Sequence, residues 1–170
     1  MELRTETGEI YRKFCLLPLF LLFSLCFTSS LFALPMNAPA PNFTLATLDG
    51  KMISLRAYQG KIVILKLGTT WCPGCRDQDK ELQKIDEFIK GAGIILVEVF
   101  LDDSAEDVRI YQQEHAMKSP MVTLLGNERL MRDYGVYAIP RLIIISAEQK
   151  VLSDSTGMTA QQIKARILQN

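Results

Sequence analysis

The sequence predicts an α/β domain with a mixed central sheet flanked by helices. Aliphatic runs of strand length alternate with segments whose apolar residues recur at helical spacing. Hairpin signals at Asp49-Gly50 and Ala147-Glu148 stand near the two ends of the folded part. Strands joined through helices pair in parallel, whereas hairpin strands pair antiparallel, so one sheet is expected to contain both arrangements.

The length and charge of the chain fit one ordinary globular domain. With 170 residues it is long enough for a single domain with its own core. Lys and Arg together number 19, as do Asp and Glu, so the formal net charge is zero. Because there is no basic excess to neutralise phosphates, nucleic acid is not expected as a partner.

Residues 1–34 are predicted to be a signal peptide or a membrane anchor. A polar, basic stretch at residues 1–13 precedes the uncharged apolar run Phe14–Phe27, which is the layout of a secretory signal. The chain stays uncharged to Leu34, which is long enough to span a bilayer instead. Both readings place the rest of the chain in the periplasm or on the extracytoplasmic face of the membrane.

A Pro-rich linker at 35–41 is predicted to lead into the folded domain, 42–170. The linker and the polar flank at the N-terminus argue against the alternative that the apolar run is a buried helix of the domain.

The strands are predicted from two kinds of pattern. Alternating apolar and polar residues flank the Asp49-Gly50 turn, as in a hairpin. The dense aliphatic runs Ile62–Leu67 and Ile94–Leu101 are typical of strands buried on both faces. Strands are expected at 42–48, 51–55, 62–67, 94–101, 121–125, 142–146 and 150–153.

The helices are predicted from spacing, caps and stops. Leu82, Ile85 and Ile89 recur at helical spacing before Gly91. Ser104 and Thr159 are residue types that cap helix N-termini. Helices are expected at 76–90, 104–115, 127–134 and 159–168.

Two of the four cysteines are candidates for chemistry. Cys15 and Cys26 lie in the N-terminal apolar segment, which leaves the folded domain with Cys72 and Cys75 alone. A crosslink that closes so short a loop gains little stability, so the pair is interpreted as functional rather than structural.

The spacing of the pair predicts unequal roles. A helix that starts at Cys72 places its free N–H groups and dipole beside that sulfur, which stabilises a thiolate. Pro73 suits the first helical turn, and Cys75 falls on the same face of the helix. Cys72 is therefore predicted as the exposed attacking thiolate and Cys75 as the buried resolving thiol, with their redox-active disulfide serving in place of a cofactor.

Other readings of the pair remain open. The pair could be half of a tetrahedral zinc site, but such a site needs two more ligands and the domain offers only His115 and carboxylates. No metal site is therefore predicted. Two thiolates could bind Cu(I). His115 ends a helix and is interpreted as structural, whereas Trp71 either shields the disulfide and contacts substrates or merely packs.

Ile139-Pro140 stands just before a predicted strand. A proline there cannot donate to the sheet, so it belongs to the first residues of the strand. It is also a position suited to a cis peptide bond.

Together these residues resemble the thioredoxin superfamily, most nearly its TlpA/ResA-like exported thiol-disulfide oxidoreductases. The similarity runs from about Ala38 to Asn170. It is carried by Ala40-Pro41-Asn42-Phe43, Leu48-Asp49-Gly50, Gly60-Lys61-Ile62-Val63, Trp71-Cys72-Pro73-Gly74-Cys75, Asp102-Asp103-Ser104, Tyr134-Gly135-Val136 and Ile139-Pro140.

The resemblance implies a thioredoxin-like fold with an N-terminal β-hairpin and a helical insertion around 104–125. It implies a cis Pro140 beside the disulfide and an Ile139 backbone that pairs with the substrate chain. It implies protein thiols and disulfides as substrates, reduction as the direction, as in cytochrome c maturation, and it allows a membrane redox partner that recycles the site.

Three residues depart from the family pattern. Lys66 replaces Asn or Asp, Gln78 replaces a common Glu, and Arg141 replaces a common Thr. Glu98 stands at the matching place in the second buried strand, so we hypothesise a charge-swapped pair of Lys66 and Glu98 beneath the disulfide. A buried carboxylate or a lysine of depressed pKa would carry the proton of Cys75, whereas an ammonium would lower the pKa of the thiol. Alternatively, one side chain reaches the surface without touching the sulfurs.

Two further functions compete with disulfide exchange. Thr69 stands three residues before Cys72, as in the Thr-x-x-Cys of peroxiredoxins, although Leu65 replaces their usual Pro. A Cu(I) chaperone of the Sco type resembles Cys-x-x-x-Cys with a distant His, whereas this chain has the shorter spacing and His115 in the insertion.

Overall fold

The computed structural model describes residues 33–115 and 117–169. The predicted signal peptide or anchor, 1–34, therefore lies outside the described residues except at its last two positions. Among the residues described, no helix combines the length and the apolar character needed to cross a membrane.

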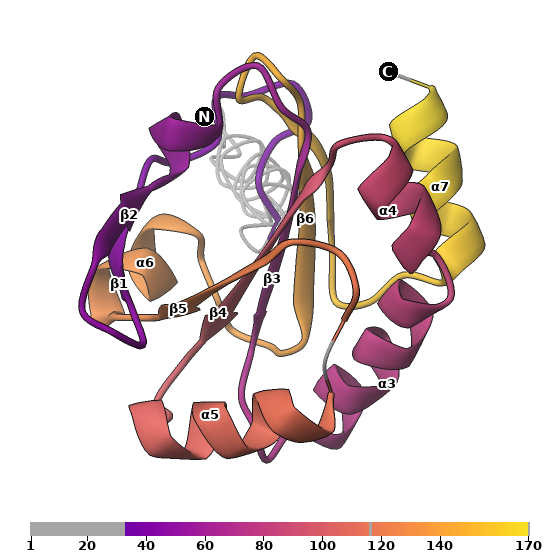
Figure 1. Ribbon diagram of the computed structural model, residues 1–170. Helices are drawn as coiled ribbons and strands as arrows, with labels where there is room; N and C mark the ends of the chain where they lie inside the picture. The colour runs from indigo at the N-terminus through magenta and orange to yellow at the C-terminus, as the bar shows by residue number, and fades with distance from the viewer. Residues whose placement is uncertain (1–32, 116, 170) are drawn as a thin grey trace, which may run out of the picture. The chain divides into compact units, whose positions relative to one another are not determined.

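A seven-stranded mixed sheet, ordered β2-β1-β5-β4-β3-β6-β7, runs through the described part of the chain (Figure 1). β3, β4 and β5 pair in parallel, and the other neighbours pair antiparallel. This is the predicted mixed sheet. The strands are β1 (Thr44–Thr47), β2 (Met52–Ser54), β3 (Val63–Gly68), β4 (Ile95–Phe100), β5 (Met121–Leu125), β6 (Arg141–Ile145) and β7 (Val151–Ser155).

The helices follow the predicted order, with one break and one addition. They are η1 (Leu55–Tyr58), α3 (Pro73–Gln83), α4 (Asp86–Gly91), α5 (Ala105–Glu114), α6 (Glu128–Asp133) and α7 (Ala160–Leu168). The short 3-10 helix η1 had no sequence signal. Ser104 and Thr159 cap α5 and α7 through their side chains.

The single helix predicted at 76–90 is two helices. α3 begins at Pro73, as the spacing of the cysteines predicted, and the chain leaves helical geometry at Ile85, where φ is −117° and ψ is 16°. The break directs Asp86 toward the loop before β5, where its carboxylate accepts from the N–H groups of Lys118 at 2.7 Å and Ser119 at 3.0 Å. Such a long-range contact leaves no trace in local spacing.

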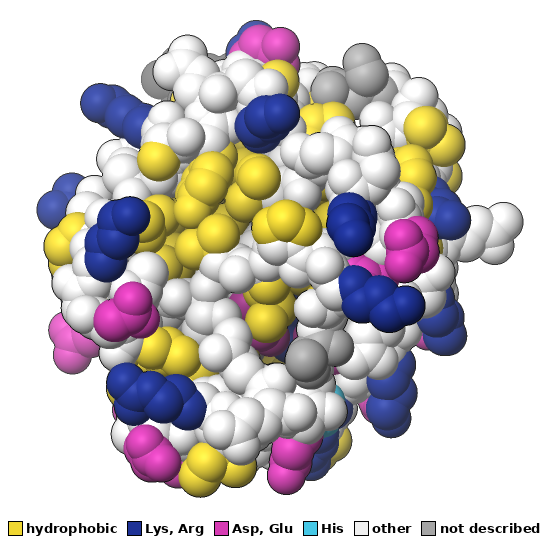
Figure 2. Space-filling model, in the orientation of Figure 1, with side chains coloured by type: hydrophobic (Ala, Val, Ile, Leu, Met, Phe, Trp, Pro, Cys, Tyr) yellow, Lys and Arg dark blue, Asp and Glu magenta, His cyan; other side chains and the backbone are white. Residues whose placement is uncertain are grey.

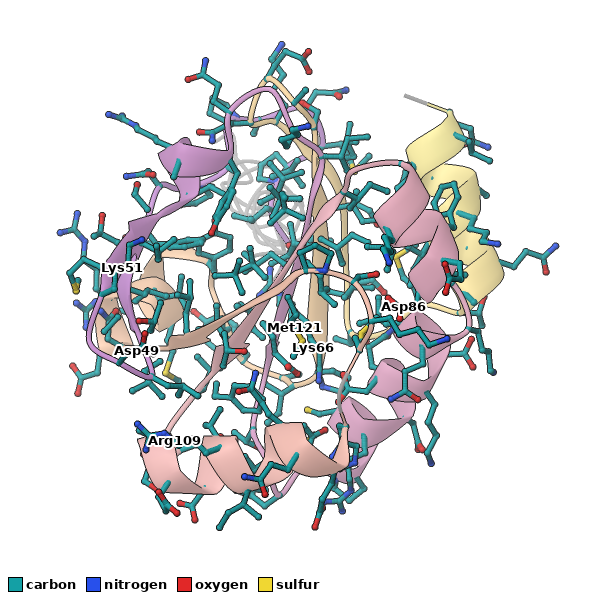
Figure 3. The ribbon with its side chains drawn as sticks, in the orientation of Figure 1. Asp49, Lys51, Lys66, Asp86, Arg109 and Met121 are labelled. Atoms are coloured by element: carbon teal, nitrogen blue, oxygen red, sulfur yellow. The ribbon has the colours of Figure 1, made fainter. Side chains whose placement is uncertain are left out.

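β3 is buried on both faces, as its aliphatic run predicts. Val63, Leu65 and Leu67 pack in one core cluster, which also contains residues of α6. Ile64 belongs to a second cluster, which contains residues of α3, α4 and α7. Because side chains alternate along a strand, Lys66 shares the face of Ile64 and points toward α3 (Figure 3).

The segment 35–41, predicted as a linker, is held along the edge strand β7. Asn37 N–H donates to Val151 O at 2.8 Å, and Val151 N–H donates to Ala38 O at 2.9 Å. Ala40 N–H donates to Gln149 O at 2.8 Å. These bonds cover part of a sheet edge whose backbone groups would otherwise be unpaired.

Candidate active site

Cys72 and Cys75 lie where β3 gives way to α3. Cys72 is the N-cap of α3, and Pro73 is its first residue. The Sγ of Cys72 accepts a hydrogen bond from the N–H of Cys75 at 3.2 Å. Both cysteines are present as free thiols on the first turn of the helix, which is the arrangement that the spacing predicted.

The prediction that Cys72 is exposed is wrong. Cys72 is 6% exposed and Cys75 is 0% exposed. The sequence analysis was right only in predicting that Cys75 is the more buried of the two. As an N-cap, Cys72 turns its sulfur toward the first helical turn rather than toward solvent. Burial, followed by the hydrogen bond with Cys72, raises the pKa of the Cys75 thiol to about 12, against the opposing effects of a backbone hydrogen bond from Thr69 and the charge of Lys66. Cys75 is therefore a thiol at neutral pH.

Glycines bring the neighbouring elements close to the pair. A Cβ added at Gly74 would lie 3.1 Å from the Cδ of Pro140, and one at Gly68 would lie 2.8 Å from the Sγ of Cys75. The Ile139–Pro140 peptide bond is cis, as the resemblance implied. The Cys72–Cys75 turn and the cis-proline loop thus meet with no side chain between them. Pairing of the Ile139 backbone with a substrate stays a prediction.

Trp71 is 64% exposed beside Cys72. A side chain so exposed contributes little to the core, so of its two readings the packing role does not fit. A large aromatic surface is therefore exposed next to the Cys72 residue.

Lys66 and Glu98 meet beneath the cysteines. The two residues are register partners on β3 and β4, and Lys66 Nζ donates to Glu98 Oε1 at 2.5 Å. Lys66 also donates to Asp79 Oδ1 on α3. The three side chains are 2%, 5% and 9% exposed, so neither member of the hypothesised pair reaches the surface.

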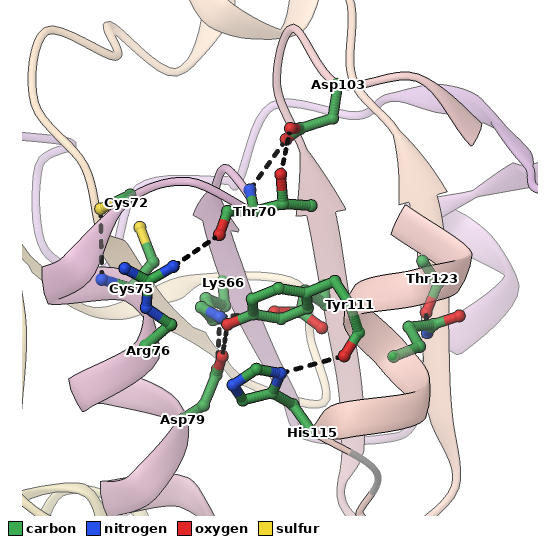
Figure 4. Close-up of polar contacts among 12 residues, drawn as sticks. Lys66, Thr70, Cys72, Cys75, Arg76, Asp79, Asp103, Tyr111, His115 and Thr123 are labelled. Carbon is green, nitrogen blue, oxygen red and sulfur yellow. Dashed lines mark hydrogen bonds and ion pairs between the residues drawn. The ribbon is translucent and has the colours of Figure 1, made fainter. Parts of the chain in front are cut away.

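Tyr111 of α5 completes this group (Figure 4). Its hydroxyl donates to Asp79 Oδ2. The ring of His115 stacks on that of Tyr111, with centroids 4.1 Å apart. Lys66, Asp79, Glu98 and Tyr111 are hereafter called the buried cluster.

Two members of the buried cluster, Asp79 and Tyr111, were missed in the sequence analysis. Asp79 had a signal, since it follows Cys75 by four residues and so shares the buried face of α3 with it. Tyr111 had none, because its contact with α3 depends on how the insertion folds back over the sheet.

Burial and neighbouring charges oppose each other within the buried cluster. Burial by itself lowers the pKa of Lys66, but the carboxylates of Glu98 and Asp79 outweigh it and hold the pKa above its usual value. A lysine of depressed pKa therefore does not fit these surroundings. Burial raises the pKa of Glu98, and although Lys66 opposes that shift, Asp79 adds to it.

Gln78 and Arg141, the other two residues that depart from the family pattern, also form hydrogen bonds with neighbouring elements. The Gln78 side chain donates to Met158 O at 3.0 Å and accepts from Met158 N–H at 2.8 Å, a pair of hydrogen bonds that an ionised Glu at this position could not make. Arg141 donates to both carboxylate oxygens of Asp154, at 2.7 and 2.5 Å, and to Gly135 O. Both side chains brace loops that border the cysteines.

In residues 33–115 and 117–169, no three His, Cys, Asp or Glu side chains gather in a way that would hold a metal ion. On the face that Figure 2 shows, basic and acidic side chains are interspersed rather than gathered in a basic patch.

Comparison with known proteins gives one consistent relationship. The model of the AhpC/TSA family matches residues 36–154. Thiol-disulfide oxidoreductase ResA of Bacillus subtilis (strain 168) is 29% identical over 128 residues, which are 75% of this chain and 70% of that protein. ResA of Bacillus thuringiensis subsp. konkukian is 28% identical over 126 residues, 74% of this chain and 72% of that protein.

Solved structures show the same fold. The thioredoxin domain of a thiol-disulfide oxidoreductase from Bacteroides vulgatus superposes with a TM-score of 0.71 at 22% identity, covering 81% of this chain and 98% of that one. A thioredoxin-family thiol:disulfide interchange protein from Chlorobium tepidum gives a TM-score of 0.68, again at 22% identity, 81% and 98%. The predicted thioredoxin-like fold is confirmed.

Proposed function

This chain belongs to the AhpC/TSA family and is a thiol-disulfide oxidoreductase, and from that premise we propose that it reduces disulfides of protein cysteines outside the cytoplasm. The observation that carries the proposal is the asymmetry of the pair. Cys72 caps a helix N-terminus, whereas Cys75 is fully buried with a pKa raised to about 12.

The asymmetry fits a two-step exchange. The Cys72 thiolate attacks one sulfur of the substrate disulfide, forms a mixed disulfide and releases the first substrate thiolate. Cys75 then loses its proton and attacks the Sγ of Cys72, which releases the second substrate thiolate. Two electrons pass from the cysteine pair to the substrate, and the pair ends as a disulfide.

The proposed substrates are the paired cysteines of apocytochromes before haem attachment. Support comes from the resemblance to ResA-like proteins and from the exposed Trp71 and cis Pro140 beside the pair, which offer an extended chain an apolar contact and a backbone edge. The signal or anchor predicted at 1–34 supports a place outside the cytoplasm. Each turnover leaves a disulfide, so we propose that a membrane redox partner reduces it again.

The reduction potential of the Cys72–Cys75 couple tests the direction. We would equilibrate the full-length protein in dithiothreitol or glutathione buffers and count free thiols by mass spectrometry. A potential near that of thioredoxin, about −270 mV, is expected for a reductant. A value near about −120 mV would contradict this direction and make the protein a disulfide donor.

One observation favours a peroxidase as a second candidate function. Across the residues that the structure describes, the Thr69 hydroxyl is the buried side-chain atom without a hydrogen-bond partner, and it precedes Cys72 at the peroxiredoxin spacing. Peroxide consumption by a Cys75→Ser variant separates the two functions. A peroxidase would still oxidise Cys72 at an unchanged rate, whereas the proposed reductase would consume peroxide no faster than a free thiol does.

A further inference from the structure

Residues 34–41, hereafter called the strap, are part of the folded domain. Besides the hydrogen bonds to β7 described above, Pro39 forms an isolated antiparallel bridge with Lys150. Leu34 packs against the core cluster shared by β3 and α6, and Ala40 belongs to that cluster. A cut within the strap would therefore uncover the sheet edge at β7 and take apolar side chains from the core.

The strap begins at a buried carboxylate. Leu34 N–H donates to Asp154 Oδ2 at 2.6 Å, and Arg141 donates to both oxygens of the same carboxylate. The Asp154 side chain is 3% exposed and that of Arg141 is 5% exposed. Arg141 directly follows the cis Pro140, so one carboxylate joins the start of the strap to the loop beside the cysteines.

This carboxylate is suited to hold a chain terminus at residue 34. A chain that began there would keep the hydrogen bond to Asp154, which would then be donated by its α-ammonium group. Hydrogen bonds between two charged groups are stronger than those of a neutral N–H. The like charge of Arg141 weakens the attraction but leaves the hydrogen bond in place. Removal of every residue before Leu34 would therefore break none of the strap's contacts with Asp154, β7 or the core.

The sequence before the strap has the layout of a cleavable signal. The apolar run at 14–27 is followed by a short uncharged segment, 28–33, that ends in Ala33. A small residue at the end of such a segment is typical of a signal cleavage site. Leu31 is larger than the residue usual two positions before it.

A rival cleavage site lies inside the strap. Ala38 and Ala40 supply two small residues, but Pro41 would follow the cut. The structure gives a second argument against this site, because a cut after Ala40 would remove almost the whole strap. The bond between Ala33 and Leu34 is the one whose cleavage leaves the strap complete.

We propose that the Ala33–Leu34 bond is the cleavage site of a signal peptide, and that the new α-ammonium group of Leu34 docks on Asp154. This rests on the proposed location outside the cytoplasm and deepens it. A signal peptidase hydrolyses the bond during export, before the domain folds. One water is consumed: Ala33 leaves as a carboxylate, and the Leu34 nitrogen keeps the electrons of the broken bond and becomes an ammonium. The mature terminus is then tied through Asp154 and Arg141 to the cis-proline loop.

The N-terminus of the exported protein tests the cleavage. The full-length chain is expressed in a bacterium with a periplasm, and the purified product is analysed by intact mass and N-terminal sequencing. The expected product is 34–170, beginning Leu-Pro-Met-Asn. An exported chain with any other terminus, or with a lipid on Cys26, would overturn this inference alone. A chain that stays uncut in the cytoplasm would refute the proposed location as well.

Ala33→Phe is the decisive variant, because it places a large side chain directly before the cut. The yield of chain beginning at Leu34 is expected to fall at least roughly tenfold, with uncut chain accumulating. Ala38→Phe is the matched control, since it makes the same change at the rival site and should leave the terminus at Leu34. Equal yields of the Leu34 terminus from both variants would contradict the assignment.

Acetylation of the terminal amine tests the docking. The exported protein is treated with limiting acetic anhydride, and mass spectrometry of its N-terminal peptide gives the rate at the Leu34 amine. The matched control is a synthetic peptide of residues 34–41. The folded protein is expected to react about tenfold more slowly than the peptide, because an amine that is hydrogen-bonded to a carboxylate is less available to the reagent.

The double variant Arg141→Thr/Asp154→Ser separates docking from the general effect of folding. It removes the carboxylate without leaving the guanidinium buried alone, so its Leu34 amine is expected to react at the rate of the peptide. If the unaltered protein already reacts at that rate, or if the double variant stays as slow as the unaltered protein, the terminus does not dock on Asp154.

Discussion

At the scale of single residues, the two cysteines differ more than the symmetry of their motif suggests. Cys75 is enclosed by α3, β3 and the backbone around Gly68, and its pKa rises to about 12 chiefly through burial. Cys72 caps the helix and keeps a small exposed fraction. The proposed order of attack rests on this difference in surroundings rather than on the residue type.

This asymmetry predicts selective alkylation. Between about pH 7 and 9, iodoacetamide is expected to modify Cys72 in the reduced protein and to leave Cys75 unmodified, because Cys75 stays protonated in that range. Mass spectrometry of peptides from protein quenched at successive times measures both rates. In Cys72→Ser, the remaining thiol should react far more slowly than the thiol of Cys75→Ser. Similar rates in the two variants would contradict the assignment.

The close approach of Gly68 to Cys75 predicts a packing cost. Gly68→Ala would place a methyl group 2.8 Å from the Cys75 sulfur, which is too close without a shift of α3 or β3. Such overpacking is expected to lower the free energy of unfolding by about 1–3 kcal/mol in urea titrations of the reduced protein.

Gly91→Ala is the control for this substitution. A Cβ at Gly91 meets nothing within 4 Å, and Gly91 ends α4. Alanine there is expected to leave stability unchanged or to raise it by up to about 1 kcal/mol. Equal effects at positions 68 and 91 would show that contact with the sulfur is not the cause.

At the scale of elements, buried polar side chains hold the loops that carry the site. Arg141 ties the start of β6 to Asp154 on β7, and Leu34 N–H donates to the same carboxylate at 2.6 Å. Gln78 ties α3 to the loop before α7. The cis-proline loop and the cysteine helix are therefore fixed to the sheet by contacts specific to this sequence.

Breaking the Arg141–Asp154 pair predicts a large loss of stability. Arg141→Thr, which introduces the residue common in the family, leaves the carboxylate of Asp154 buried with fewer donors. The expected cost is about 3–5 kcal/mol in urea unfolding. The double variant Arg141→Thr/Asp154→Ser should recover part of it, because no charge stays buried.

Arg129→Ala is the comparison. It removes an exposed ion pair with Asp133 on α6 and is expected to change stability by less than about 1 kcal/mol. If Arg141→Thr costs as little as Arg129→Ala, the buried pair is not holding the loop.

At the scale of the whole molecule, stability is expected to depend on pH through Asp86. Burial alone would raise the pKa of Asp86, but hydrogen bonds from Ser119 and Lys118 outweigh it and lower the pKa. A lowered folded-state pKa adds stability above the unfolded value of about 3.9, and this is lost as pH falls through the folded value. The bonds join the start of α4 to the approach to β5 (Asp86 is labelled in Figure 3).

Asp86→Asn measures this contribution. Above about pH 5 the variant is expected to be less stable than the unaltered protein by about 1–2 kcal/mol, because charged acceptors make the stronger hydrogen bonds. Toward lower pH the two unfolding curves should converge. A difference that is constant with pH would assign the effect to packing instead of charge.

Much of the fold was predictable because it depends on local pattern. The aliphatic runs predicted β3 and β4, and the capping residues Ser104 and Thr159 predicted where α5 and α7 begin. The break at Ile85 and the pairing of 35–41 with β7 were not predictable, because both depend on partners distant in sequence.

The sequence by itself identified the cysteine pair and the two buried strands that carry the lysine and the glutamate beneath it. Two cysteines at helical spacing, a proline before a strand, and a lysine and a glutamate at corresponding places of two buried strands are all visible in the chain. Only the tertiary structure decided that Cys72 is nearly buried, that Asp79 and Tyr111 join Lys66 and Glu98, and that a side chain at residue 68 would collide with the Cys75 sulfur. The reason is physical: spacing fixes which face of an element a side chain occupies, whereas burial, hydrogen bonds and proton affinity depend on what the other elements bring to that face.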